Sequence, residues 1–151
     1  MPGGWTDVGG GVQDRPMHTT NYFDTFIAVS EDTAATAATE PPTRASPSVA
    51  ELTYRMIAEN PYRFTSDDVI FAVWADRRDI PAGERESARA EFFAKGQPCM
   101  RSSDLGKRYG WGVHADAEGR IALVPVESEE YERMATGEGG VTVTRAMRSK
   151  R

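Results

Sequence analysis

The side chains best suited to chemistry gather in residues 99–120, which hold the single cysteine and one of the two histidines of the chain. Between residues 108 and 115, small or polar residues alternate with apolar ones, as they do in a β-strand with two unlike faces. One face would carry aromatic and aliphatic side chains. The other, nearly bare face would consist of Arg108, Gly110, Gly112 and His114. The two glycines would then form a shallow trough between a guanidinium group and an imidazole.

This trough predicts a binding site for an anionic or planar ligand, because basic side chains bond to carboxylates and phosphates. The residues that would contribute are Arg101, Lys107, Arg108, Tyr109, Gly110, Trp111, Gly112 and His114. On this interpretation the protein is a binding or regulatory module that acts through residues 99–120 on a small anionic ligand or a protein partner. The structural alternative is that a helix packs onto the two glycines and a backbone carbonyl satisfies His114.

A second hypothesis, from another class, is a small enzyme that uses Cys99 and His114. A nearby imidazole lowers the pKa of a thiol and increases the fraction of nucleophilic thiolate. Nothing in the spacing brings the two residues together, and a single cysteine is more often a small buried apolar residue. With His18 they are the only imidazole or thiol ligands in the chain, and they lack metal-ligand spacing. No metal site and no cofactor are therefore expected.

Nucleic acid is a further partner to consider, because three helices followed by a β-hairpin is the element order of winged-helix domains. Arg85 and Arg89 would face the groove, and Arg120 would lie on the wing. Three glutamates on the same helix would repel phosphate, and the isoelectric point of the chain is about 5.1. A nucleic-acid partner is therefore disfavoured.

The distribution of charge permits an anionic partner, although the net charge is −5. Acidic side chains dominate residues 17–76, whereas basic ones prevail in residues 77–120 and again in residues 141–151. Solvated surface is the commoner explanation of such asymmetry. The longest apolar run, residues 69–75, is too short to cross a bilayer, and we find no export signal. We therefore expect a cytoplasmic protein with no membrane partner, and its single cysteine fits a reducing compartment.

The chain predicts one α+β domain over residues 17–151, with three to four helices, a β-hairpin in the C-terminal half and one or two further strands. Residues 1–16 hold five glycines and no apolar periodicity, so a disordered extension is expected there. The aromatic and β-branched residues 22–29 predict the first strand. Residues 30–47, rich in Ala, Thr and Pro, predict a mobile loop.

Two helices are predicted from their capping residues. Ser48 begins an S-x-x-E pattern, in which its hydroxyl caps the N–H of Glu51 and the carboxylate returns to the cap. Its helix should end before Pro61 and bury four apolar residues, which are Val49, Leu52, Met56 and Ile57. Thr65 or Ser66 should start a second helix, with two aspartates in the first turn and two arginines at the end. Its β-branched residues leave a strand as the alternative.

The remaining elements follow the same rules. Residues 82–95 predict a third helix with Arg85 and Arg89 outward. Residues 105–126 predict the β-hairpin, and Ser128 should cap a short helix that runs to residue 134. The alternating residues 141–146 predict a last edge strand.

Four strings of this sequence resemble an uncharacterised bacterial family known only as a domain of unknown function. They are residues 17–32, 60–81, 95–131 and 146–151, so the resemblance covers residues 17–151. The resemblance implies a small bacterial cytoplasmic protein. It implies no activity, substrate or catalytic residue.

Overall fold

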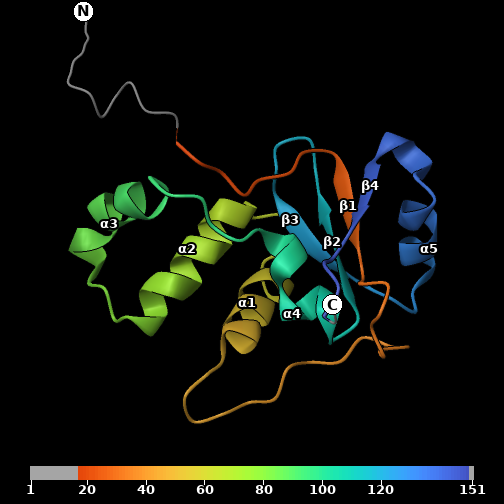
Figure 1. Ribbon diagram of the computed structural model, residues 1–151, viewed down its shortest axis with the longest axis horizontal. Helices are drawn as coiled ribbons and strands as arrows, with labels where there is room; N and C mark the ends of the chain where they lie inside the picture. Colours follow the sequence, from red (N-terminus) through yellow and green to blue (C-terminus); the bar gives the residue numbers. More distant parts are fainter. Residues whose placement is uncertain (1–16, 150–151) are drawn as a thin grey trace, which may run out of the picture. The chain divides into compact units, whose positions relative to one another are not determined.

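The computed structural model describes residues 17–149 and shows an α+β fold, as predicted (Figure 1). The disordered extension predicted for residues 1–16 lies outside the described residues. The chain divides into two compact units. The larger unit contains Thr20–Asp79 and the chain from Pro98 onward, and the smaller unit contains Ile80–Gln97 and the segment that ends at Thr19.

A four-stranded mixed sheet is the centre of the larger unit, with the order β3-β2-β1-β4. Its strands are β1 (Thr25–Ala28), β2 (Trp111–Ala115), β3 (Ile121–Pro125) and β4 (Thr142–Arg145). The strand β2 runs antiparallel to β3 and to β1, and β4 runs parallel to β1. The predicted hairpin and edge strand are therefore confirmed. All four residues of β1 are buried, because β1 lies between two strands and both faces of the sheet are covered.

Helices α1 (Val49–Ala58) and α2 (Ser66–Arg77) cover one face of this sheet. The short helix α4 (Asp104–Lys107) packs beside α1 and precedes β2. The buried core on this face consists of Ile27, Ile57, Val69, Val73, Met100, Leu105, Val113, Ala115 and Ile121. Burial of these apolar side chains is the main stabilising contribution to the fold.

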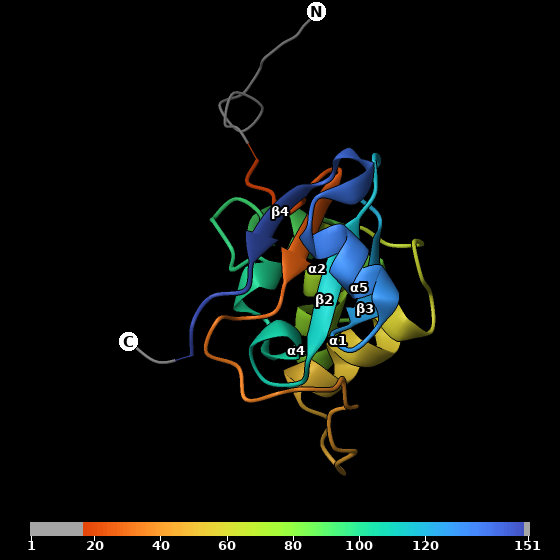
Figure 2. The same cartoon turned by 90° about the vertical axis from the view of Figure 1, so that its right-hand side faces the viewer.

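Helix α5 (Glu129–Ala135) covers the opposite face, where it lies across the sheet from α1 and α2 (Figure 2). It packs Tyr131 edge-on against Phe26, with ring centroids 5.1 Å apart. The Tyr131 hydroxyl also accepts a hydrogen bond of 2.9 Å from the Val29 N–H. The sheet thus has a second, smaller core of Phe26, Ala28 and Val124 under α5.

Local capping residues decide where the helices begin. The Thr65 hydroxyl accepts from the Asp68 N–H, and the Asp68 carboxylate accepts from the Thr65 N–H. This complete capping box explains why residues 66–77 form a helix rather than a strand. Ser48 and Ser128 cap α1 and α5 by the hydroxyl alone, which accepts from the Glu51 N–H and the Tyr131 N–H respectively.

Two details of the predicted α1 are wrong. Val49 is 53% exposed rather than buried. The Glu51 carboxylate does not serve the cap; it is buried, accepts from the Arg44 N–H and pairs with Arg55 one turn later. A buried carboxylate needs such partners because removal from water is costly.

The smaller unit contains α3 (Arg85–Phe92), which follows a 3₁₀ turn at Ala82–Glu84 and is shorter than the predicted helix over residues 82–95. Arg85 Nε donates to the Ile80 carbonyl at 2.9 Å, and the Arg89 guanidinium lies 5.6 Å from the centre of the Phe93 ring. Both arginines are half-buried, so the prediction that they point outward is wrong. The arginines that a winged-helix domain would direct at DNA are used within this unit instead.

Residues 30–47 form no helix or strand, as predicted, but part of this segment is anchored. The Thr39 N–H donates to the Tyr109 carbonyl at 2.9 Å, and the Thr39 carbonyl accepts from Trp111 Nε1 at 2.8 Å. Ala38 is held by the Glu127 carboxylate. The loop therefore packs against the chain that leads into β2. In residues 17–149 no helix is long and apolar enough to span a membrane.

Candidate functional site

The strand β2 begins at Trp111, so the predicted alternation back to Arg108 is wrong. Gly110 precedes the strand with φ +80°, in the left-handed region that glycine favours. A Cβ at Gly110 would lie 2.7 Å from the Ala37 carbonyl oxygen. Gly110 therefore lies in a tight turn that packs against the loop of residues 30–47, and it shares no strand face with Gly112.

The face that contains Gly112 is covered. A Cβ at Gly112 would lie 2.6 Å from Phe26 Cζ and 3.0 Å from Tyr131 Cε2. Phe26 comes from the neighbouring strand β1, and Tyr131 comes from α5. The trough is thus filled by two aromatic rings, which agrees with the structural alternative of a helix packed on the glycine.

His114 lies on the same strand face, but its partner is a side chain rather than a backbone carbonyl. Its Nδ1 is 2.8 Å from the Tyr62 hydroxyl, and the two rings meet edge-on at 5.6 Å. Tyr62 has φ +58°, a strained conformation for a large side chain, and its N–H donates to the Ile121 carbonyl. Burial raises the pKa of the Tyr62 phenol, and the charges of Glu130 and Asp116 raise it further. The phenol therefore remains a neutral hydrogen-bonding partner of the imidazole near pH 7.

Cys99 has a different tyrosine as its partner. The Cys99 Sγ lies 3.3 Å from the Tyr22 hydroxyl. Burial raises the pKa of Tyr22, the hydrogen bond to Cys99 raises it further, and the Arg101 charge lowers it. The hydrogen bonds described for residues 17–149 thus pair Cys99 with Tyr22 and His114 with Tyr62, not with each other.

Arg101 holds the C-terminal segment of the chain. Its Nε donates to the Arg145 carbonyl at 2.6 Å, and its own carbonyl accepts from the Met147 N–H at 2.8 Å. A Cβ at Gly106 would lie 3.0 Å from the Cβ of Ala146, so the C-terminal segment packs closely on α4. Two basic segments that are 44 residues apart at Arg101 and Arg145 therefore lie side by side.

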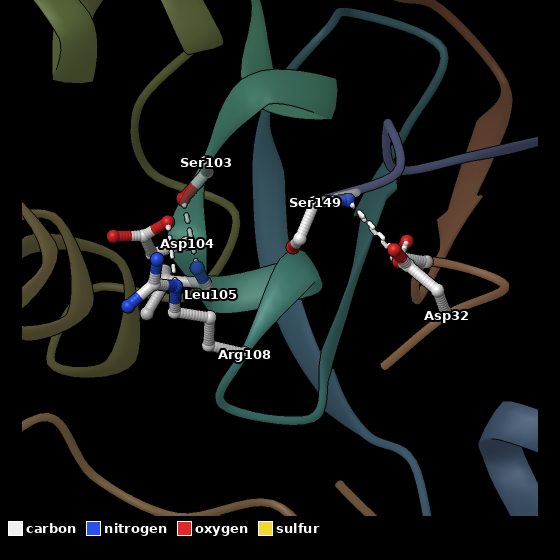
Figure 3. Close-up of polar contacts among 7 residues, drawn as sticks. Asp32, Ser103, Asp104, Leu105, Arg108 and Ser149 are labelled. Carbon is white, nitrogen blue, oxygen red and sulfur yellow. Dashed lines mark hydrogen bonds and ion pairs between the residues drawn. The ribbon is translucent and has the colours of Figure 1, made fainter. Parts of the chain in front are cut away.

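Side-chain hydrogen bonds hold both segments in place, one at the start of α4 and one near the C-terminus (Figure 3). The Ser103 hydroxyl accepts from the Leu105 N–H and starts α4, and Asp104 faces Arg108 at 3.7 Å. On the other side, the Ser149 N–H donates to both carboxylate oxygens of Asp32, at 3.1 and 3.0 Å.

We name the junction of these two segments the C-terminal seam and define it by the five basic residues that the two segments carry. They are Arg101, Lys107, Arg108, Arg145 and Arg148. Arg108 has the Asp104 carboxylate nearby, whereas the other four have no ion-pair partner in the part of the chain that the structure describes. Arg145 also donates from its guanidinium to the Val29 carbonyl at 3.3 Å. The seam therefore carries positive charge that the described chain leaves largely uncompensated.

A comparison with protein-family models finds a match that covers residues 17–151. The chain belongs to DUF6157, a family of unknown function. This membership confirms the resemblance to a domain of unknown function and adds no activity to it. No curated protein and no solved structure matches this DUF6157 chain.

Some residues of the candidate site could be predicted from the sequence, but their contacts could not. The basic character of Arg101, Lys107 and Arg145 is visible in the sequence, as two separate regions of positive charge. Tyr22 and Tyr62 were not expected at the site, because no spacing rule relates a tyrosine to a residue 77 or 52 positions away. Within residues 17–149, no group of three or more His, Cys, Asp and Glu residues is placed to hold a metal ion.

We expect Cys99 to react with iodoacetamide at pH 7 no faster than a free model thiol, because its hydrogen-bonding neighbour is a phenol and not an imidazole base. The rate of thiol loss measures this directly. His114→Ala should leave the rate unchanged. Suppose instead that Cys99 reacts more than about tenfold faster than the model thiol and that His114→Ala lowers this rate. That result would support the hypothesis of an enzyme that uses Cys99 and His114.

Proposed function

We propose that this DUF6157 chain is a non-enzymatic, cytoplasmic binding module and that the C-terminal seam binds an anionic partner. The bond from Arg101 Nε to the Arg145 carbonyl carries the proposal, because it holds two basic segments next to each other. The expected partner is still an anion, as predicted from the sequence. The proposed site is the C-terminal seam instead of the face at Gly112, which Phe26 and Tyr131 fill.

The charges of the seam favour an anion for two reasons. Guanidinium and ammonium groups without a carboxylate partner are free to bond to carboxylates or phosphates. The net charge of the chain is −5, so a local positive surface also directs an approaching anion to one place. Asp32 lies at the edge of the seam, but its two oxygens accept from Ser149, and Oδ1 also accepts from the Ser30 hydroxyl.

The contacts of Cys99 and His114 support a binding role over catalysis. A nucleophile is activated by a base within hydrogen-bond distance. The two residues have separate tyrosine partners instead, and the pKa of each tyrosine is raised. Neither tyrosine is thus a phenolate that would act as a base at neutral pH.

A fluorescent polyglutamate peptide provides the test of this proposal, with inorganic phosphate as the small-anion competitor. We expect the peptide to bind and its affinity to fall as salt is raised. The double variant Lys107→Glu/Arg148→Glu should bind roughly tenfold more weakly, because exposed charges contribute about 0.5 to 1 kcal/mol each. Competition by phosphate would indicate that a small anion suffices, and its absence that several carboxylates are needed.

The control is Arg120→Glu, which reverses one charge, where the double variant reverses two, and lies in the β2–β3 turn outside the seam. Its affinity should stay within about twofold of the parent. A parent protein that binds neither probe contradicts the proposal. Mixed-sequence duplex DNA that binds more tightly and is released by Arg120→Glu would support the winged-helix alternative instead.

A further inference from the structure

The strand β4 ends the sheet, and its hydrogen bonds show which of its backbone groups face away from β1. The Thr142 N–H donates to the Asp24 carbonyl at 2.9 Å, and the Ala146 N–H donates to the Ala28 carbonyl at 2.8 Å. In a strand, the N–H and C=O of one residue point to the same side, and successive residues alternate. Residues 142, 144 and 146 therefore face β1, and Val143 and Arg145 face outward.

Arg101 already occupies the C-terminal end of this edge, where its carbonyl accepts from the Met147 N–H at 2.8 Å. The Arg145 carbonyl accepts from Arg101 Nε, which confirms that Arg145 faces away from β1. The remaining outward groups are the N–H and C=O of Val143 and the N–H of Arg145. None of the three has a hydrogen-bond partner within residues 17–149. Their spacing matches that of an added strand.

The side chains around this edge combine apolar surface with positive charge. Val143 is 39% exposed and Met147 is 49% exposed. Arg145 and Arg148 lie on the same segment, and Arg101 is bonded to it. A chain laid along β4 would therefore meet both an apolar side chain and guanidinium groups.

We propose that β4 accepts an extended acidic peptide as a further strand of the sheet, with its carboxylates at the seam. This inference rests on the proposed function and names the partner class. The backbone groups of Val143 and Arg145 supply the hydrogen bonds, and the arginines select an acidic sequence.

A second copy of this chain fits the edge less well than an acidic peptide. Pairing β4 with β4 would bring Arg145 and Arg148 of one copy near the same residues of the other. Like charges across a strand pair are destabilising, and charged residues on an edge strand protect against such self-association. The charge of the edge thus selects a partner of opposite sign.

A peptide of alternating valine and glutamate is the probe for strand addition, and its control is the same peptide N-methylated at alternate amides. The two peptides have equal charge, but the control cannot form a β-ladder on that edge. We expect the parent protein to bind the control roughly tenfold more weakly. Amide hydrogen exchange at Val143 and Arg145 should slow only with the unmodified peptide.

The same hydrogen bonds can also be tested by changing the protein instead of the peptide. Val143→Pro removes an N–H that faces away from β1, so the β1–β4 ladder keeps all its bonds. Val143→Pro should bind the unmodified peptide roughly tenfold more weakly than the parent protein does. The affinity of Val143→Ala should stay within about twofold of the parent value.

Equal binding of the two peptides, with unchanged exchange at Val143, would overturn strand addition but leave anion binding at the seam intact. Loss of binding for both peptides and for polyglutamate would overturn the proposed function as well. A peptide-free dimer that dissociates in the Val143→Pro protein, measured by sedimentation, would assign the edge to a second copy and contradict this inference.

Discussion

Replacing Gly112 by valine should destabilise the protein by roughly 3 kcal/mol, at the upper end of the usual range for an overfilled core. The cost begins at the Cβ, which would lie 2.6 Å from Phe26 Cζ and 2.9 Å from Phe26 Cε1. Phe26 is fully buried and cannot move away without displacing Tyr131, which packs on it. Chemical unfolding of the parent and the variant measures the difference.

Two further variants show whether the effect comes from this contact. Gly83→Val is the matched control, because a Cβ there would meet nothing within 4 Å. Phe26→Leu combined with Gly112→Val should recover part of the lost stability by making space for the valine. A Gly112→Val protein with parental stability that has lost affinity for a phosphate or carboxylate ligand would show that the face is an open binding trough.

Replacing Trp111 by alanine should cost about 3 kcal/mol, the lower end of the range for a large aromatic residue, because the ring is only partly buried. The ring packs on Tyr54 with centroids 5.4 Å apart, and Nε1 donates to the Thr39 carbonyl. The substitution removes both the apolar contact and one of the hydrogen bonds that anchor the loop. Thermal or chemical unfolding tests this prediction.

Trp111→Phe separates the two contributions to this effect. It keeps an aromatic ring against Tyr54 and removes the bond to Thr39, so it should cost about 1 kcal/mol. If Trp111→Ala unfolds like the parent but no longer binds an acidic peptide, the aromatic residue belongs to a binding surface rather than to the core.

Elements specified by neighbouring residues could be predicted from the sequence. The capping box of Thr65 and Asp68 spans three residues and starts a helix wherever the chain permits it. The alternation of residues 141–146 likewise predicts the edge strand, and the observed β4 is only one residue shorter at each end. Such signals need no knowledge of the tertiary structure.

The candidate site could not be predicted, because it depends on contacts between distant parts of the chain. Arg101 bonds to Arg145 across 44 residues, and Cys99 meets Tyr22 across 77. The error in the glycine trough has a different origin. A glycine can continue a strand or turn with positive φ, and only the tertiary structure shows that Gly110 turns.

Amide chemical-shift mapping of the ¹⁵N-labelled full chain with polyglutamate tests the central claim most directly, because it locates the bound anion. Binding at the C-terminal seam predicts that the largest shift changes occur near Arg101 and Lys107 and along residues 143–149, and that they diminish as salt is raised. Shift changes centred on residues 111–125, or no shift changes at all, would contradict the assignment of anion binding to the seam.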